Sequence, residues 1–461
     1  MRCYLLNIYF SRVALAASVD LLCFAAAALL SWFAIHPASS TLTPWNYTAG
    51  VSLGWILCFA LLYYADAYSL AALGSGRRTF HTIAITIGLT AAVLSGGYLL
   101  LPLSEEEWKL TFQVGGTFFP LLLTGRLGTR KLLCRASFSE RVVLLGTSDL
   151  ARSIARAVRA RCNLGTDVAG FLSDEENEQG TWIEGYPVLG KIHQLEKILN
   201  REHIDRIVVA SKRREEHFPA DVLLWAKLNG IKVESGVSFY ERITGRVYLR
   251  ELRPSYFIFS KGFRCSRGWE ALKRAFDVAV SMCGLVCAAP VLLLCACAIR
   301  LDSKGPVLFA QERVGRGGRN FRVFKLRTMR TDAERETGPV WANPADRRIT
   351  RVGRLLRKAR IDEVPQLWNV LRGDMSLVGP RPERPEFADE LGARYPYFRY
   401  RCAVRPGITG WAQIRCGYVH DVSQWEDKLA LDLYYLKYRS PLMDTLILWN
   451  TVKTVVLLRG L

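Results

Sequence analysis

The sequence predicts a three-part membrane protein: an N-terminal α-helical membrane bundle, a central α/β domain, and a C-terminal, mostly α-helical (α+β) domain with a re-entrant membrane helix. Three observations support this fold class. Long apolar stretches fill the first 125 residues, short β-branched runs alternate with helical patterns in the middle, and a further apolar segment has basic residues on both flanks. With 461 residues, 50% hydrophobic content and a net charge of +20, the chain is too long for one domain and too apolar to be fully soluble.

Four apolar stretches predict four transmembrane spans within residues 1–138. Each approaches or reaches the ~20 residues that a helix needs to cross a bilayer core. The first is too long, and is followed by too many similar runs, to be a cleaved signal peptide. Basic loops alternate with uncharged or acidic ones, so the positive-inside rule places both ends of the bundle in the cytoplasm. The stretches are residues 13–35, 49–68, 80–102 and 109–125.

Residues 139–245 alternate β-branched runs with helical patterns, which predicts a small Rossmann-like βαβ domain. Its first turn, residues 146–151, keeps only Gly146 of the dinucleotide fingerprint G-x-G-x-x-G/A. Without the second glycine, the backbone loses its close approach to a pyrophosphate. A structural or regulatory domain is therefore favoured over a nucleotide-binding one, and residues 246–268 are expected to form an irregular, aromatic linker.

The apolar segment 273–300 is long enough for a fifth span. Pro290 lies in its middle, where it removes a helix hydrogen bond and predicts a kink or break. Lys273 and Arg274 begin the segment, and residues 300–360 hold fourteen arginines and three lysines, a density that membranes retain on the cytoplasmic side. The segment is therefore predicted to enter the membrane and return. An ordinary kinked span is the alternative.

The residues between 347 and 386 carry the strongest signal for chemistry. Arginines spaced by three line one side of a predicted helix, and this face leads into Asp362 and Glu363. Guanidinium groups favour the charged form of a neighbouring carboxylate, so Asp362 is expected to be an ionised nucleophile at neutral pH. The alternative is that both carboxylates only pair with arginines on a solvated helix. The arginines are Arg348, Arg351, Arg354 and Arg357, with Arg360 one step further.

Two further features suit a phosphorylated substrate. Mg²⁺ prefers one or two carboxylates together with phosphate oxygens, and Asp362 and Glu363 could supply the carboxylates. Arg381 lies between Pro380 and Pro382, so it is expected on a stiff loop that suits bidentate phosphate contact. A nucleophile, a metal ion and a cationic clamp are together the components of phosphoryl transfer.

Six ordered sequence blocks occur between residues 273 and 458, and together they are far more specific than any single motif. The blocks are K-R-A-F-D near 273, Q-E-R-V-G at 311, F-K-L-R-T-M at 324, I-D-E-V-P-Q at 361, G-D-M-S-L-V-G-P-R-P at 373 and R-P-G-I-T-G at 405. With these blocks, the region resembles the catalytic domain of the bacterial polyprenyl-phosphate hexose-1-phosphate transferases, the monotopic phosphoglycosyl transferases. The whole chain resembles their large exopolysaccharide-type members, which initiate glycan assembly.

The resemblance implies a two-step, ping-pong reaction. Asp362 attacks the sugar-bearing phosphate of a UDP-sugar, releases UMP and carries the phosphosugar, which undecaprenyl phosphate then attacks. Glu363 completes the family's Asp-Glu dyad by assisting metal binding or by orienting Asp362, and Mg²⁺ offsets charge on the transferring phosphoryl group. The candidates for substrate or phosphate contacts are Arg313, Lys325, Arg327, Arg360 and Arg381.

One departure from the family concerns the re-entrant helix. The family breaks this helix with a Ser-Pro pair, whereas this chain has Ala289 before Pro290, so any stabilisation from the serine hydroxyl is absent. The proline remains, and the re-entrant prediction is retained. Near the C-terminus, the interrupted apolar run 441–459 suits an interfacial helix and a helix packed on the catalytic core equally well.

These features predict an enzyme of the bacterial inner (cytoplasmic) membrane with its catalytic domain, residues 269–461, on the cytoplasmic face. The expected partners are a UDP-sugar, undecaprenyl phosphate and membrane lipids, with a homodimer as an open alternative. Glucose or galactose is favoured as the transferred hexose, and an N-acetylated sugar is the alternative. The product would initiate exopolysaccharide, O-antigen or capsule assembly.

Two other classes of function are weaker. A membrane-anchored nucleotide-sugar sensor or scaffold would leave the C-terminal region inert, which the intact Asp362-Glu363 pair argues against. An NAD-dependent sugar dehydratase would need a better glycine turn and a Tyr-x-x-x-Lys motif. Nucleic-acid binding has no motif behind the positive charge and conflicts with the membrane spans.

Overall fold

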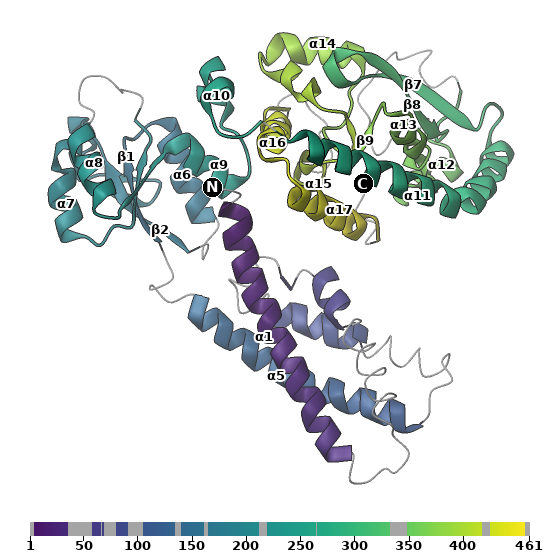
Figure 1. Cartoon of the computed structure of the whole chain (residues 1–461), viewed down its shortest axis with the longest axis horizontal. Coiled ribbons are helices and arrows are strands. Elements are labelled where there is room, and N and C mark those ends of the chain that lie inside the picture. Colours follow the sequence, from purple (N-terminus) through teal and green to yellow (C-terminus); the bar gives the residue numbers. More distant parts are fainter. Residues whose placement is uncertain are drawn as a thin grey trace. The chain divides into compact units, whose positions relative to one another are not determined.

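The computed structural model describes most of the chain, which divides into two compact units, Met1–Thr244 and Gly245–Leu461. Figure 1 draws the first unit in purple to teal and the second from teal to yellow. The described residues are 4–35, 58–65, 67–68, 80–90, 105–133, 140–160, 165–211, 219–263, 265–331, 348–416 and 425–456.

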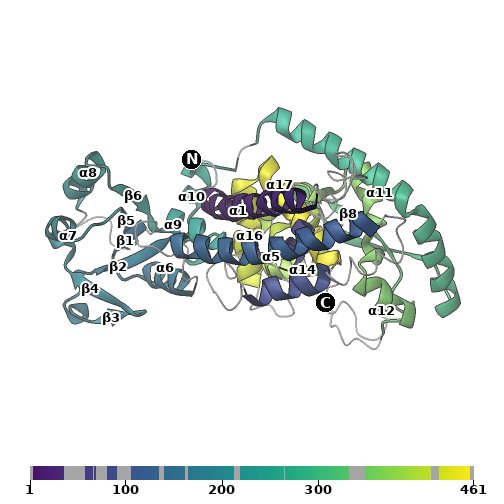
Figure 2. The same ribbon diagram turned by 90° about the horizontal axis from the view of Figure 1, so that it is seen from below.

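In the first unit, helices α1 (Tyr4–Ile35) and α5 (Glu105–Leu133) pack along one another (Figures 1 and 2). Their contact buries apolar side chains, with the rings of Phe24 and Phe118 edge to face at 5.4 Å. At one end, the Arg126 guanidinium pairs with the buried carboxylate of Asp20, its Nε lying 2.9 Å from Oδ1. The two helices are therefore held by an apolar core and by a buried ion pair.

The four predicted spans are only partly described. Residues 58–64 and 80–90 are helical, and they contribute to the same apolar core together with the turn residues Ala67 and Tyr68. Residues 49–57, 66 and 91–102 of these stretches lie outside the described residues. Among the helices that the structure describes, only α11 (Arg267–Asp302) is long and apolar enough to cross a membrane by length and composition. The four-span bundle therefore stays a prediction.

Residues 140–244 form the expected α/β domain, a six-stranded sheet in the order β3-β4-β2-β1-β5-β6 that is parallel except for β3. The centre of the sheet is buried, as parallel strands covered on both faces require. The strands are β1 (Glu140–Leu145), β2 (Thr166–Leu172), β3 (Trp182–Ile183), β4 (Tyr186–Gly190), β5 (Arg206–Val209) and β6 (Lys232–Ser235), and the helices are α6 (Asp149–Ala160), α7 (Leu195–Arg201), α8 (Ala220–Leu228) and α9 (Gly236–Thr244).

The second unit packs helices and short strands around a large apolar core that includes Trp425 and Ile447. The predicted linker 246–268 belongs to this unit, because Val247 and Leu252 are part of its core. The elements are α10 (Pro254–Phe259), α11, β7 (Leu308–Val314), β8 (Asn320–Leu326), α12 (Arg351–Lys358), α13 (Gln366–Arg372), β9 (Ser376–Val378), α14 (Pro385–Arg394), β10 (Gly407–Thr409), α15 (Trp411–Cys416), α16 (Trp425–Tyr438) and α17 (Pro441–Val456). A smaller apolar cluster forms where the end of α11 meets β8 and α12, at Ile299, Leu326 and Leu356.

Helix α11 continues through Pro290 without the break that the sequence allowed for, and Figure 2 shows it bending along its length. A bend is the other way in which a helix accommodates a proline that lacks an N–H. The middle of the helix exposes large apolar side chains such as Val286 and Leu294, at 69% and 71%. Apolar exposure continues toward both ends, at Leu272 (63%) and Leu301 (89%), so most of the length of α11 has an uncovered apolar face.

Contacts fix both ends of α11. Near its start, Arg274 donates to the carbonyls of Val370 and Leu371, at 2.6 and 2.9 Å, which caps α13. Near its end, Asp302 accepts from the backbone N–H of Val352 at 3.1 Å, just inside α12. Lys273, the other basic residue at the start, lies 2.7 Å from the carboxylate of Asp444.

The arginine-lined helix is shorter than predicted. Thr350 caps α12, its hydroxyl accepting from the N–H of Gly353 at 3.0 Å, so Arg348 lies before the helix. Arg360 lies after it, in the left-handed region with φ 58°. Three arginines therefore remain on α12 itself, namely Arg351, Arg354 and Arg357.

The C-terminal helix α17 combines the two alternatives that the sequence left open. It buries Met443 and Ile447 in the core of the unit, while Leu442, Trp449 and Val452 stay about half exposed. One face therefore packs on the catalytic core, and another leaves apolar side chains uncovered.

Candidate active site

Asp362 and Glu363 occupy a single 3₁₀ turn, η6 (Ile361–Glu363), between α12 and α13. The left-handed backbone of Arg360 ends the preceding helix and redirects the chain, a role that glycine usually fills. Consecutive residues on such a turn point in different directions, so the two carboxylates have different surroundings.

Three cations surround Glu363. Its Oε1 accepts from Arg381 Nη2 at 2.7 Å and from Lys325 Nζ at 3.1 Å, and Arg360 Nη1 lies 3.8 Å from Oε2. Burial alone would raise the pKa of this carboxyl, but the charges of Arg381 and Lys325 outweigh burial and hold the pKa well below its usual range. Glu363 is therefore ionised at neutral pH and anchors the cationic groups.

Asp362 differs from Glu363 in both its hydrogen bonding and the direction of its pKa shift. It is 7% exposed, and its Oδ1 is buried without a hydrogen-bond partner among the described residues. Burial and the adjacent negative charge of Glu363 raise its pKa, against the lowering effect of Lys325, Arg357 and Arg360. The cations favour ionised Asp362, as expected, but burial and Glu363 outweigh them, so the net shift of its pKa is upward.

The loop that carries Arg381 is held by backbone contacts. Strand β9 pairs with β10 in parallel, and beyond it the N–H of Gly379 donates to the carbonyl of Thr409 and that of Gly407 to Pro380, both at 2.9 Å. A side chain at Gly407 would collide with the Gly379 backbone, so this approach requires glycine. The stiff loop predicted for Arg381 is thus braced by a second strand.

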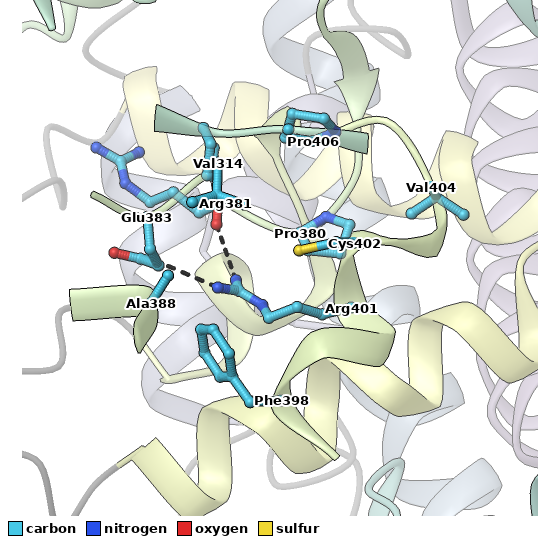
Figure 3. A pocket seen from close by; sticks show the side chains of 12 residues that line it. Val314, Pro380, Arg381, Glu383, Ala388, Phe398, Arg401, Cys402, Val404 and Pro406 are labelled. Carbon is cyan, nitrogen blue, oxygen red and sulfur yellow. Dashed lines mark hydrogen bonds and ion pairs between the residues drawn. The ribbon is translucent and has the colours of Figure 1, made fainter. Parts of the chain in front are cut away.

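A buried charge cluster lies beneath this loop, beside a pocket lined by Pro380, Phe398 and Cys402 (Figure 3). Arg401, 4% exposed, donates to the carbonyl of Arg381 at 2.8 Å and contacts Asp432 at 2.7 Å. We call Arg401, Asp432, Glu383 and Lys428 the support cluster; in it, Lys428 Nζ lies 2.9 Å from Glu383 Oε1.

The support cluster was missed by sequence reasoning. Its one sequence signal is Asp432, a charge inside the apolar run L-A-L-D-L-Y-Y-L of α16. Buried charges are rare unless they are paired, so that position indicated a partner elsewhere in the chain. Nothing local in the sequence identifies the partner as Arg401.

The two remaining residues predicted to contact phosphate, Arg313 and Arg327, lie in different places. Arg313 lies at the Arg381 loop, donating to the carbonyl of Pro382 at 3.2 Å, and burial lowers its pKa to about 10. Arg327 does not join the site, which corrects the prediction. Its guanidinium donates to the carbonyls of Ser303 and Lys304 at 2.7 and 3.0 Å and so caps the end of α11.

The surroundings of the two carboxylates suit Mg²⁺ binding by Asp362 alone better than by Asp362 and Glu363 together. No cluster of three or more His, Cys, Asp or Glu side chains that could hold a metal occurs in the described part of the chain. Oδ1 of Asp362 is an uncommitted oxygen of the kind that Mg²⁺ binds together with substrate phosphate. Glu363 is already surrounded by cations, which would oppose a second positive charge beside it.

A carboxylate oxygen without a partner among the described residues, next to a carboxylate that anchors Lys325, Arg360 and Arg381, is an arrangement that suits phosphoryl transfer. Comparison with known proteins makes this assignment specific. A model of the bacterial sugar transferase family matches residues 268–458, and a model described as a CoA-binding domain matches residues 63–217.

Several relatives carry related names. The chain is 41% identical to a UDP-N-acetylgalactosamine-undecaprenyl-phosphate N-acetylgalactosaminephosphotransferase of Aeromonas hydrophila, over 47% of this chain and 50% of that protein. It is 46% identical to a UDP-glucose:undecaprenyl-phosphate glucose-1-phosphate transferase of Caulobacter vibrioides, over 40% of this chain and 69% of that protein. It is 30% identical to the enzyme of the same name from Klebsiella pneumoniae, over 75% of this chain and 76% of that protein.

The chain belongs to the bacterial sugar transferase family, which confirms the resemblance seen in the six sequence blocks. The expectation of a sugar-1-phosphate transferase is thereby confirmed at the level of the family. The match spans half of the Aeromonas relative's length and about two thirds to three quarters of the other two.

Proposed function

We propose that this protein transfers a hexose-1-phosphate from a UDP-sugar to undecaprenyl phosphate at the inner membrane of a bacterium, with release of UMP. The observation that carries the proposal is the buried, unpartnered Oδ1 of Asp362 beside the cationic groups gathered by Glu363. A diphosphate substrate supplies the anionic oxygens that these cations can bind.

The proposed reaction has two steps. In the first, an Asp362 carboxylate oxygen forms a bond to the sugar-bearing phosphorus, the bond from this phosphorus to the bridging oxygen breaks, and UMP leaves with the electron pair. In the second, an oxygen of undecaprenyl phosphate attacks the same phosphorus and the carboxylate leaves. The chain's own cations, Lys325 and Arg381, stabilise negative charge in both steps. Mg²⁺, when bound at Asp362, would offset charge on the phosphates.

The contacts of α11 support the re-entrant arrangement. A straight helix of 36 residues would be about 54 Å long, enough to carry its end beyond a bilayer core of about 30 Å. Yet Arg274 near its start and Asp302 at its end both contact the same unit. Cysteine labels placed near residues 265 and 320 should therefore both report the cytoplasm, and labels on opposite sides would contradict this topology.

The transferred sugar is proposed to be glucose. Relatives that match over 70% and 75% of this chain, from Komagataeibacter xylinus and Klebsiella pneumoniae, are named for glucose transfer. The test is incubation of the purified chain with UDP-glucose, UDP-galactose and UDP-N-acetylgalactosamine, each with undecaprenyl phosphate and Mg²⁺. UMP and a lipid-linked glucose phosphate are expected with UDP-glucose, and no UMP with any sugar would refute the function.

A further inference from the structure

Gln366 lies on the same helical face as Glu363, one turn further along the chain. Val364 and Pro365 both have right-handed helical backbone, so the chain continues helically from η6 into α13. The hydrogen bonds on this path join residues three apart, as in a 3₁₀ helix, and side chains three apart therefore share a face. The amide of Gln366 is thus placed beside the carboxylate of Glu363, in the turn that also carries Asp362.

This face rests against strand β8. At one end, Asn369 donates to the carbonyl of Arg322 at 2.7 Å and accepts from the N–H of Phe324 at 3.0 Å. At the other end, Lys325 of the same strand contacts Glu363 at 3.1 Å. Gln366 lies between these two contacts, in the part of the chain that gathers the site's cations.

The side-chain amide of Gln366 is buried, and its N–H donor has no acceptor among the described residues. Gln366 is 3% exposed, and its Nε2 makes no hydrogen bond within the described ranges of the chain. Retaining a buried donor without an acceptor is unfavourable unless something else supplies one. Asp362 Oδ1, four residues earlier in the chain, is equally without a partner among the described residues, so the two groups are not bonded to one another.

We propose that Gln366 is a further catalytic residue, whose Nε2 donates a hydrogen bond to a non-bridging oxygen of the phosphoryl group that Asp362 attacks. The proposal rests on the function proposed above. A phosphoryl group has oxygens that accept hydrogen bonds, so it satisfies Nε2 while Asp362 bonds to phosphorus. The amide adds a neutral, directional donor to the charged contacts of Lys325 and Arg381.

The test is the rate of UMP release, without lipid acceptor, from whichever UDP-sugar the full-length wild-type chain uses best. Gln366→Met retains size and removes the donor, and its kcat should fall roughly 100-fold, as for loss of one oxyanion donor. Its Tm should stay the same or rise, because no buried donor is left unsatisfied. Gln366→Glu should lose at least as much activity, because its carboxylate repels phosphate.

Gln413→Met is the matched control, since Gln413 Nε2 already donates to the carbonyl of Ile408 at 2.8 Å. It should lower Tm and leave kcat within about twofold of wild type. The proposed role of Gln366 would be overturned if Gln366→Met kept its activity, or if its kcat and its Tm fell together. Either result would leave the proposed function of the protein intact. A wild-type chain that releases no UMP would refute the proposed function and this role together.

Discussion

Two groups of buried charges lie on either side of the Arg381 loop, and they differ in how completely they are paired. In the support cluster, Arg401 and Asp432 are 2.7 Å apart and Lys428 and Glu383 2.9 Å apart. At the η6 turn, Glu363 is paired as fully, but Asp362 Oδ1 has no partner in the described part of the structure. The difference indicates that the support cluster stabilises the fold, whereas the turn keeps one oxygen available for a substrate.

The largest expected effect comes from Asp362→Asn, which retains size and removes the proposed nucleophile. UMP release from UDP-sugar should fall by roughly 10⁴-fold or more, as for loss of other covalent nucleophiles. The free energy of unfolding should change little, because Asn fills the same volume and, among the residues that the structure describes, Oδ1 makes no hydrogen bond that the substitution would remove. Activity is measured by UMP formation and stability by denaturant unfolding. A large loss of stability would assign Asp362 to the same structural role as the support cluster.

Asp432→Asn should show the reverse pattern. It leaves the guanidinium of Arg401 buried beside a neutral amide, and breaking a buried ion pair in this way costs about 3–5 kcal/mol. Denaturant unfolding measures that cost. Among the molecules that stay folded, UMP release should persist, with a higher KM because the carbonyl of Arg381 is less firmly held. Unchanged stability would contradict the distinction between the two groups.

Arg381→Lys tests the connection between the two groups. Lysine retains the charge but loses the planar fork of donors, so contact with both Glu363 and a phosphate is weakened. We expect kcat/KM for UMP release to fall about 10- to 100-fold with little change in Tm. Arg351→Lys, on the exposed part of α12, is the matched control and should leave both values unchanged.

The smallest effect is on pH dependence. Burial and the charge of Glu363 raise the pKa of Asp362, so activity that needs its ionised form should be lost as pH falls through this raised value. Glu363 has a pKa well below 4.5, so its stabilising effect is complete above pH 4.5 and is lost only as pH falls through the depressed value. A pH profile of UMP release should therefore decline before the protein unfolds. Coincident loss of activity and structure would contradict this order.

Local sequence predicted the residues of the site but not their partners. The six blocks identified Asp362, Glu363, Lys325 and Arg381, yet these residues meet only because a turn, a hairpin strand and a loop fold together. Burial is also invisible in a local pattern. The arginines that favour ionised Asp362 were therefore visible in the sequence, but the burial that raises its pKa was not, and Arg327 was assigned to phosphate although its Nη donors cap a helix.

Regular patterns predicted the fold better than the site. β-branched runs predicted the parallel sheet of the α/β domain, and apolar length predicted α11, because these signals repeat along the chain. The short strands β9 and β10, with three residues each, have no such repeat, and they brace the Arg381 loop. Long-range pairs such as Arg401 with Asp432 leave almost no local signal for the same reason.

Trapping the covalent intermediate tests the central claim most directly. The wild-type chain is incubated with UDP-sugar and Mg²⁺ without undecaprenyl phosphate, quenched, digested and mapped by mass spectrometry. A hexose phosphate on the peptide that contains Asp362 is predicted, with its absence in Asp362→Asn. A label on another residue, or UMP release that requires the lipid acceptor, would contradict attack by Asp362.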